Sequence, residues 1–189
     1  LSVRGLNDEP VMADEKDAQG LSDLGKSFIA GQLKYMREMT LFFAPNINSY
    51  KRYVEGSFAP TAMKWGRDNR TCAIRLVGHG HSLRFENRVP GGDVNPYLAE
   101  AAMIAAGIAG IEENLKLEPA FTGNAYVSDA TRVPATLAKA TDLWEKSDFV
   151  AKVFGQEVKD HYLNMAKVEL AAFDRSITDL ERYRSFERM

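Results

Sequence analysis

The order of apolar and polar residues along this chain predicts one helix, then a short strand region, then a mainly helical second half. From Ser22 to about Phe42, apolar side chains recur every three or four positions, which is the spacing of an amphipathic helix. Residues 1–20 are rich in turn formers and are expected to be irregular or to form a hairpin. Residues 44–69 carry glycine, proline and asparagine at short intervals. They are expected to form a loop, which at this length is usually functional or poorly ordered.

Two segments have the composition and alternation of strands. Residues 71–77 and 82–89 are rich in β-branched and apolar residues, and glycines mark the turn at 78–81 between them. The three segments together predict an antiparallel hairpin.

The second of these strands places three charged side chains on one face. Successive residues of a strand point to opposite faces, so Leu83 and Phe85 are expected to face a core. Arg84, Glu86 and Arg88 then share the other face, with about 7 Å between neighbours. A carboxylate between two guanidinium groups can be a solvated row of surface charges. It can also be a site where a metal ion, phosphates and an acidic substrate meet.

The second half of the chain is predicted to be mainly helical. Asn95 and Pro96 are a good N-cap and a good first helical residue for a helix that runs to about Leu115. Its many alanines allow close approach of another element, so it is expected to be central and buried. A loop over 117–135 and helices over 136–146, 147–154 and 156–185 are predicted to follow. The apolar stripe of the last helix is expected to belong to the core.

Composition excludes several classes of protein. The chain has 189 residues, 45% of them hydrophobic and 26% charged, which fits one globular domain. A net charge of −2 favours neither nucleic acid nor an anionic membrane as a partner. The most apolar run, 97–111, is too short to span a bilayer. Cys72 is the only cysteine, which fits a reducing cytoplasm. The chain begins at Leu1 without methionine, so it is expected to be a piece of a longer polypeptide.

Positive charge is concentrated between residues 51 and 88. Arginine suits phosphate and carboxylate ligands because its planar fork donates two parallel hydrogen bonds. The cluster therefore suggests a site for an anionic small molecule, although charge alone favours surface arginines paired with acidic groups. The basic residues are Lys51, Arg52, Lys64, Arg67, Arg70, Arg75, Arg84 and Arg88, against Glu55, Asp68 and Glu86.

Three further residue types are weaker candidates for chemistry. Glu86 could bind a divalent cation beside phosphates, but a single carboxylate flanked by arginines is more simply a salt-bridged surface group. His79 and His81 have the spacing of a zinc pair without an evident third ligand, and turn histidines in solvent are the simpler interpretation. Cys72 lies in a predicted strand and is expected to serve packing.

Several motifs in order resemble the catalytic domain of the glutamine synthetase family. They are Asn48-Ser49-Tyr50-Lys51-Arg52, Gly56-x-x-Ala59-Pro60, Asp68-Asn69-Arg70 with Arg75, Arg84-x-Glu86-x-Arg88-x-Pro90, Asn95-Pro96-Tyr97-Leu98 and Gly107-x-x-Gly110-Ile111-Glu112. The resemblance covers essentially the whole chain. It implies an α+β fold in which antiparallel strands are backed by helices. It also implies that residues 1–189 are the C-terminal portion of that domain, without the N-terminal domain or the first part of the catalytic domain.

The same resemblance implies an activity and roles for seven residues. Members join an amine to the γ-carboxylate of glutamate through γ-glutamyl phosphate, using ATP and Mg²⁺ or Mn²⁺. Arg70 and Arg88 are then catalytic residues that meet the transferred phosphoryl group and also contact substrate. Arg52 holds the glutamate carboxylate, and Phe58 is a further substrate-binding residue. Arg70, Arg75 and Arg84 contact the nucleotide, and Glu86 is a metal ligand. These roles are consistent with the residue types, because phosphoryl transfer depends mostly on positioning and on neutralising phosphate charge, which arginines and a divalent metal provide.

Two departures from the family pattern shape the expectation. Ammonia-using members carry glutamate where this chain has Phe58, and the segment around it looks like relatives that join glutamate to larger amines such as polyamines. The further metal ligands and the N-terminal domain of the family lie upstream of what is present, so the 189 residues alone are expected to be inactive.

Family members form large homo-oligomeric rings. Tyr126 lies near a tyrosine that some bacterial relatives adenylylate, but its surroundings match poorly and an ordinary loop tyrosine is expected. A non-catalytic structural or regulatory relative is the alternative.

Overall fold

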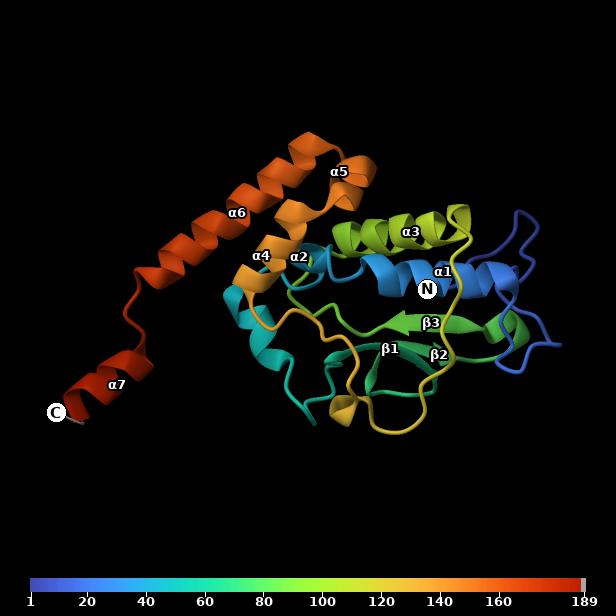
Figure 1. Ribbon diagram of the computed structural model, residues 1–189, viewed down its shortest axis with the longest axis horizontal. Coiled ribbons are helices and arrows are strands. Elements are labelled where there is room, and N and C mark those ends of the chain that lie inside the picture. The colour runs from blue at the N-terminus through green and yellow to red at the C-terminus, as the bar shows by residue number, and fades with distance from the viewer. Residues whose placement is uncertain (188–189) are drawn as a thin grey trace.

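Two capped helices cover one face of a small sheet. The computed structural model describes residues 1–187 and places α1 (Asp23–Tyr35) and α3 (Pro96–Glu112) together above the strands (Figure 1). The Ser22 hydroxyl accepts a hydrogen bond from the Gly25 amide, and the Asn95 side chain accepts one from the Tyr97 amide. Both predicted helix starts are therefore confirmed, because each side chain satisfies an amide that the first helical turn leaves without a partner.

The helix predicted to run from Ser22 to Phe42 is interrupted. α1 ends at Tyr35, and a separate short helix, α2 (Thr40–Phe43), follows it. The Thr40 hydroxyl donates to the carbonyls of Met36 and Arg37, at 3.2 and 2.8 Å. Between the two helices the amides of Glu38, Met39 and Thr40 donate to carbonyls three rather than four residues back, so regular α-helical bonding is interrupted there.

The sheet is mixed rather than antiparallel. Among the described residues it has the order β1-β2-β3, with β1 (Ala62–Arg67) parallel to β2 (Cys72–Val77) and β2 antiparallel to β3 (Arg84–Asn87). The predicted hairpin is thus confirmed, with a 3₁₀ turn, η2 (Gly80–Ser82), in its connection.

The prediction of a loop over 44–69 is wrong at its end, where β1 forms, and a 3₁₀ helix, η1 (Ile47–Arg52), lies near its start. β1 is stabilised by a distant segment on its outer edge, where the Met63 amide donates to the Thr131 carbonyl at 2.8 Å. Burial on both faces removes the polar–apolar alternation by which a strand is recognised.

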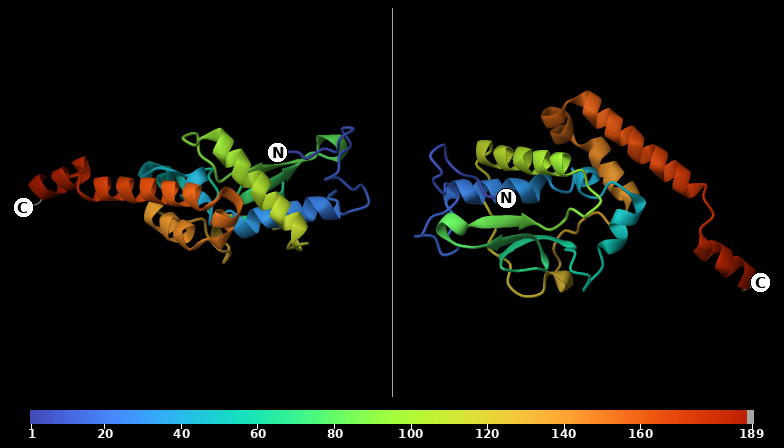
Figure 2. Two further views of the ribbon diagram at one scale, coloured as in Figure 1. Left: turned by 90° about the horizontal axis from the view of Figure 1, so that it is seen from above. Right: turned by 180° about the vertical axis from the view of Figure 1, so that it is seen from behind.

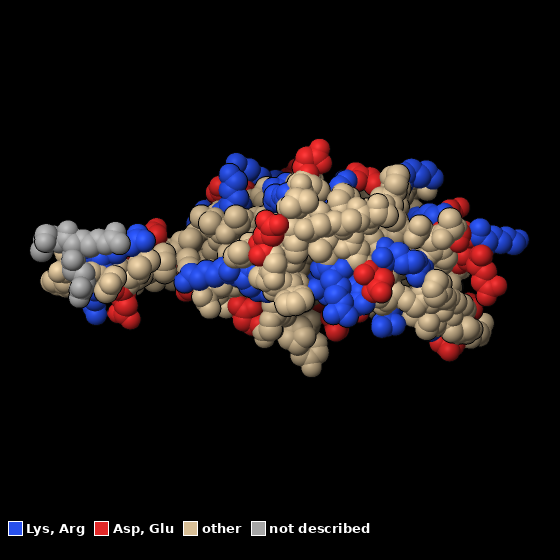
Figure 3. Space-filling view, turned by 90° about the horizontal axis from the view of Figure 1, so that it is seen from below, with Lys and Arg blue, Asp and Glu red and all other residues tan. Residues whose placement is uncertain are grey.

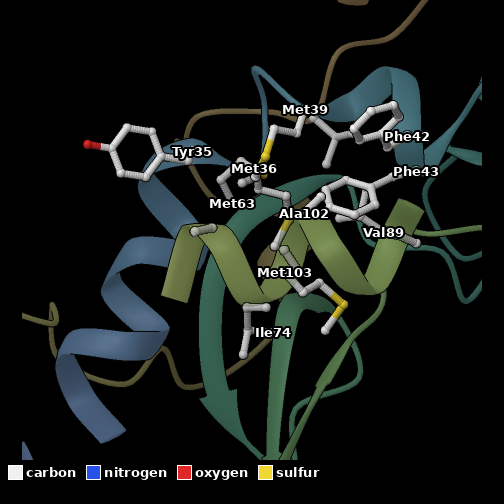
Figure 4. Close-up of a cluster of buried hydrophobic side chains, with 14 of the residues drawn as sticks. Tyr35, Met36, Met39, Phe42, Phe43, Met63, Ile74, Val89, Ala102 and Met103 are labelled. Atoms are coloured by element: carbon white, nitrogen blue, oxygen red, sulfur yellow. The ribbon is translucent and has the colours of Figure 1, made fainter. Parts of the chain in front are cut away.

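The core lies between the sheet and the two covering helices (Figure 4). Its side chains come from α1, α2, β1, β2 and α3, from the turn between α1 and α2, and from the segment after β3. They include Met36, Met39, Phe42, Phe43, Met63, Ile74, Val89, Ala102 and Met103. The alanine-rich α3 is central, as predicted, but only on the face toward α1. On its other face Tyr97, Ile104 and Ile108 are exposed.

The C-terminal helices depart most from expectation. α4 (Leu137–Lys146) and α5 (Asp148–Phe154) match the prediction, whereas the predicted helix over 156–185 is two helices, α6 (Gln156–Asp174) and α7 (Asp179–Glu187). Thr178 caps α7, because its hydroxyl accepts from the Glu181 amide while its own amide donates to the Glu181 carboxylate.

The apolar stripe of this region is only partly core. Near the start of α6, Tyr162 packs edge-on against Phe42. The end of α6 and all of α7 extend away from the body as an arm (Figures 1 and 2), on which Ile177 and Leu180 are 69% and 58% exposed. The expectation that the whole stripe is core is therefore wrong in the part of the chain that the structure describes.

Two other segments connect these elements. Residues 1–20 are irregular, as expected, with an isolated bridge between Ala13 and Leu21. The loop predicted over 117–135 contains a short 3₁₀ helix, η3 (Ala125–Val127). Within residues 1–187 no helix combines the length and hydrophobicity that crossing a membrane requires.

Candidate active site

The pairing of β2 with β3 brings charged residues together on the face of the sheet away from α1 and α3. Arg75 lies directly opposite Glu86, and the Arg88 amide continues the ladder with a 2.9 Å bond to the Ala73 carbonyl. Leu76 and Phe85, which point to the other face, are completely buried. The alternation predicted for the second strand is therefore confirmed. Figure 3, which views the molecule from this side, shows basic side chains gathered near the strands with acidic ones between them.

Glu86 lies between two guanidinium groups, one just after its own strand, β3, and one on the neighbouring strand, β2. Its Oε2 is 3.0 Å from Nη1 of Arg75 and 3.8 Å from Nη1 of Arg88. The Arg75 and Arg88 side chains are only 15% and 18% exposed, and that of Glu86 is 34% exposed. Partly buried charges at these separations interact more strongly than solvated surface pairs. The arrangement is a preorganised cluster, which distinguishes it from a row of independent surface charges.

Asp68 completes this cluster from the turn after β1. Its Oδ1 accepts hydrogen bonds from Nε of Arg75, at 2.9 Å, and from Nη2 of the same side chain. The hydrogen bonds and charge of Arg75 lower the pKa of Asp68 below the usual aspartate value, and the charge of Arg70 acts in the same direction. Arg75 is thus held from two sides, by Asp68 and by Glu86.

The substitution Arg75→Gln is expected to raise the pKa of Asp68 back toward the usual value of about 3.9. The folded-state pKa lies below the unfolded one, so the stabilisation from Asp68 is present above about pH 3.9 and is lost as the pH falls through the folded pKa. The measurement is a carboxyl-carbon NMR titration. Arg84→Gln, which removes a guanidinium without a bond to Asp68, is the control. An Asp68 titration unchanged by Arg75→Gln would contradict the assignment.

Arg88 connects the cluster to two neighbouring segments. Its Nε donates to the Arg70 carbonyl at 3.1 Å, and its Nη2 donates to the Phe58 carbonyl at 2.8 Å. Phe58 itself has a positive φ of 65° and a side chain exposed at the edge of the site. The structure therefore brings together Arg75, Glu86, Arg88 and the backbones of Arg70 and Phe58.

Arg52 is placed close to this group but with its guanidinium on the main chain. Nη1 donates to the Val89 carbonyl at 2.5 Å and Nη2 donates to the Pro90 carbonyl at 3.2 Å, while the group lies over the Tyr53 ring. Tyr53 donates to the same Val89 carbonyl, and burial raises the pKa of Tyr53 to about 12 against the opposing charge of Arg52. Arg52 thus fixes the segment after β3, and its role in binding glutamate stays a prediction.

Two of the predicted residues stand apart from the cluster. The Arg84 side chain is exposed at the far end of β3, where its closest bond within residues 1–187 is a 3.5 Å contact with the Ser82 carbonyl. The Arg70 side chain is also exposed, on the turn that supplies Asp68. Both guanidinium groups are available to an anionic ligand, and their nucleotide-binding roles stay predictions.

Glu86 fits the role of one ligand to a divalent cation, not of a whole metal site. Both contacts of its carboxylate with described residues use Oε2, which leaves Oε1 for a cation. No group of three or more histidine, cysteine, aspartate or glutamate side chains is positioned to hold a metal among residues 1–187. Mg²⁺ prefers six oxygen ligands, and nucleotide sites commonly supply one or two carboxylates together with phosphates.

The weaker candidates are used elsewhere. Nδ1 of His81 lies 3.1 Å from Nη1 of Arg4. Cys72 is completely buried, and burial raises its pKa to about 11, so its thiol is suited to packing rather than to nucleophilic attack.

Asp68 and Tyr126 are the residues whose contacts the sequence did not indicate. Asp68 belongs to a quoted motif, but its bond to Arg75 follows from the parallel pairing of β1, which the loop prediction missed. The Tyr126 hydroxyl donates to the Ala59 carbonyl at 2.8 Å, across 67 positions of sequence. No local pattern in the sequence carries such a contact.

Comparison with known proteins identifies the family. The model described as "Glutamine synthetase, catalytic domain" matches residues 1–185. The chain is 61% identical over 189 residues to γ-glutamylethanolamide synthetase GlnA4 of Streptomyces coelicolor, covering 100% of this chain and 40% of that protein. It is 37% identical over 185 residues to a glutamate–isopropylamine ligase of a Pseudomonas species, covering 96% of this chain and 40% of the ligase.

A further relative and a solved structure agree. γ-Glutamylputrescine synthetase PuuA of Escherichia coli is 32% identical over 182 residues, with 96% of this chain and 38% of PuuA covered. A structure described as a GmaS/ADP complex superimposes with a TM-score of 0.88 at 27% identity, covering 98% of this chain and 44% of that one. The chain thus spans about two fifths of the length of these relatives, and it belongs to the glutamine synthetase family, whose catalytic domain it matches.

Proposed function

We propose that this chain forms one wall of the active site of an ATP-dependent ligase that joins an organic amine to the γ-carboxylate of glutamate. The observation that carries the proposal is the Arg75–Glu86–Arg88 cluster, which lies on an accessible sheet face beside the loop of Phe58. A non-catalytic scaffold protein would not require Arg75, Glu86 and Arg88 to be partly buried together, so the cluster favours a ligase.

The proposed reaction has two steps. A γ-carboxylate oxygen of glutamate takes the terminal phosphoryl group of ATP and releases ADP, which gives γ-glutamyl phosphate. The amine nitrogen then attacks the activated carbonyl carbon, the bond to the phosphate oxygen breaks, phosphate leaves, and the nitrogen loses a proton.

The residues of this chain supply positive charge for the phosphates. Arg88 is held by Glu86 and by the Phe58 and Arg70 carbonyls, so its guanidinium needs little reorganisation to meet the transferred phosphoryl group. Arg70 shares that role, and with Arg75 and Arg84 it contacts the nucleotide. Arg52 holds the glutamate carboxylate. A bound Mg²⁺ or Mn²⁺ would neutralise phosphate charge, and Glu86 would be one of its ligands.

Phe58 supports an organic amine rather than ammonia. Its ring is 76% exposed, it has no charge with which to attract ammonium, and Val54 in the same loop is also exposed. Exposed apolar side chains in a loop beside the charged cluster suit an amine with carbon atoms to cover them. The names of three relatives, which refer to ethanolamide, isopropylamine and putrescine products or substrates, point in the same direction.

Phosphate release by the full-length protein with glutamate, ATP and a panel of amines tests the proposal. Ethanolamine, isopropylamine, putrescine and ammonium are the panel. We expect turnover with at least one organic amine to exceed turnover with ammonium. Faster turnover with ammonium than with every organic amine would overturn the amine assignment, and no turnover with any of them would favour a non-catalytic relative.

The substitution Phe58→Ala is expected to raise KM for the preferred amine about tenfold, because it removes roughly 1.5 kcal/mol of apolar contact. KM for glutamate and for ATP should change little, since the ring lies at the edge of the charged cluster. Ile104→Ala, which shortens an exposed apolar side chain on α3, is the control. A Phe58→Ala protein with an unchanged amine KM would show that the ring does not contact the amine.

The proposal extends to the whole protein. One carboxylate cannot fix Mg²⁺ in near-octahedral geometry. We therefore propose that the 189 residues are active only as part of a chain as long as those of the relatives. The exposed apolar residues of the α6–α7 arm support assembly into a large homo-oligomeric ring, to be checked by mass measurement in solution. A cytoplasmic location is also part of the proposal.

A further inference from the structure

The loop that carries Phe58 has a conformation that needs support from outside. In this loop, residues 54–60, two residues have a left-handed backbone conformation. Their φ angles are 76° at Gly56 and 65° at Phe58. A non-glycine residue in that region is strained and persists only where its surroundings hold it. Within the loop, the Ser57 hydroxyl lies 2.6 Å from both the Arg52 and Val54 carbonyls. These short-range bonds close the first turn but do not reach Phe58.

Two side chains from other parts of the chain hold the loop at and just after Phe58. Nη2 of Arg88 donates to the Phe58 carbonyl, and the Tyr126 hydroxyl donates to the next carbonyl, that of Ala59, each at 2.8 Å. Ala59 is buried, so its carbonyl has little access to water as an alternative partner. The two bonds fix consecutive peptide groups and so fix the direction in which the Phe58 ring points.

Tyr126 is itself mounted on the sheet. It lies in η3, where the preceding amide, that of Ala125, donates to the Thr71 hydroxyl at 2.8 Å. The Asn69 side chain donates to the Gly123 carbonyl at 2.9 Å, and Nη1 of Arg132 donates to the Ala125 carbonyl at 3.2 Å. Asn69 and Thr71 flank Arg70 on the turn between β1 and β2. The platform under Tyr126 is therefore the same turn that carries the phosphate-binding arginine and Asp68.

We propose that Tyr126 is a positioning residue that fixes the Phe58 loop to the β1–β2 turn and thereby sets the affinity for the amine. This inference rests on the proposed function for its consequence, and on the contacts above for its geometry. Tyr126 acts through Phe58, because its hydroxyl proton is donated to the Ala59 carbonyl next to that residue.

The test is Tyr126→Phe in the full-length protein, which removes one oxygen and keeps the ring. We expect KM for the preferred amine to rise roughly threefold to tenfold, which is the range that one net hydrogen bond supplies. KM for glutamate and for ATP should stay within about twofold, as for Tyr183→Phe, a control at an exposed tyrosine of α7. In the Phe58→Ala background, Tyr126→Phe should have little further effect on amine KM, since both changes act through the same ring.

Every other result of this experiment either overturns the inference or leads to a second test. An unchanged amine KM in Tyr126→Phe overturns the inference, and so does an equal loss for all three substrates with a lower unfolding temperature, because that pattern is general destabilisation. If the wild-type protein turns over no amine, the proposed function fails, and hydrogen exchange then tests the positioning alone. Faster exchange of the amides of residues 54–59 in Tyr126→Phe supports it, and unchanged exchange overturns it.

Discussion

The substitution Glu86→Gln is expected to reduce amine-dependent phosphate release by the full-length protein about 10²–10³-fold, the range measured when one preorganised electrostatic contact is removed from an active site. Glutamine has nearly the same shape but no charge. It leaves Arg75 and Arg88 without the carboxylate that lies 3.0 and 3.8 Å from them, and it removes the proposed metal ligand. We also expect more Mg²⁺ to be needed for half-maximal activity.

Stability separates this effect from unfolding. Glu86 is 34% exposed and Arg75 keeps its bond to Asp68, so the loss of stability should be on the order of 1 kcal/mol and the variant should stay folded at the assay temperature. Glu112→Gln, at an exposed glutamate near the end of α3, is the matched control and should retain full activity. If Glu86→Gln keeps activity within about threefold of the wild type, the three charges are a surface row after all.

The substitution Gly31→Ala is expected to destabilise the protein by about 2 kcal/mol, within the usual range for overpacking. A Cβ atom at Gly31 would lie 2.0 Å from the Ala106 carbonyl oxygen and 2.8 Å from Gly110, so α1 and α3 would have to move apart. Alanine favours an isolated helix over glycine by about 1 kcal/mol, and a net loss would therefore come from packing. For a unit of this size, the unfolding temperature should fall roughly 4–8 °C.

Gly92→Ala provides the comparison. No atom lies within 4 Å of a Cβ built at Gly92, and its φ is not positive, so the same chemical change should leave the unfolding temperature nearly unaltered. Equal unfolding temperatures for Gly31→Ala and the wild type would mean that the two helices can separate without loss. The close approach of α1 and α3 would then not be what keeps the two helices packed on the sheet.

Local patterns predicted the elements whose residues interact with near neighbours. The caps at Ser22 and Asn95 depend on bonds that span three residues or fewer, so they are visible in sequence. The shared face of Arg84, Glu86 and Arg88 follows from strand alternation alone. β1 was missed because side chains on both of its faces are buried, which removes the alternation of polar and apolar residues, and because one of its two edges pairs with the distant residues 131–133.

The candidate site was likewise predicted only in part from the sequence. The motifs identified the arginines and Glu86 through their resemblance to a family, and comparison confirmed the family. Periodicity could not distinguish the exposed end of α6 from its packed beginning, since both carry the same apolar spacing.

The sequence by itself determined the family, the positive charge of the site and the face on which three of its charges lie. Only the tertiary structure decided how those charges are held: Arg75 between Asp68 and Glu86, Arg88 on the Phe58 carbonyl, and Tyr126 on the Ala59 carbonyl. The physical reason is distance along the chain. Periodicity and capping are local, whereas these bonds join strands and loops that meet only after the sheet has formed.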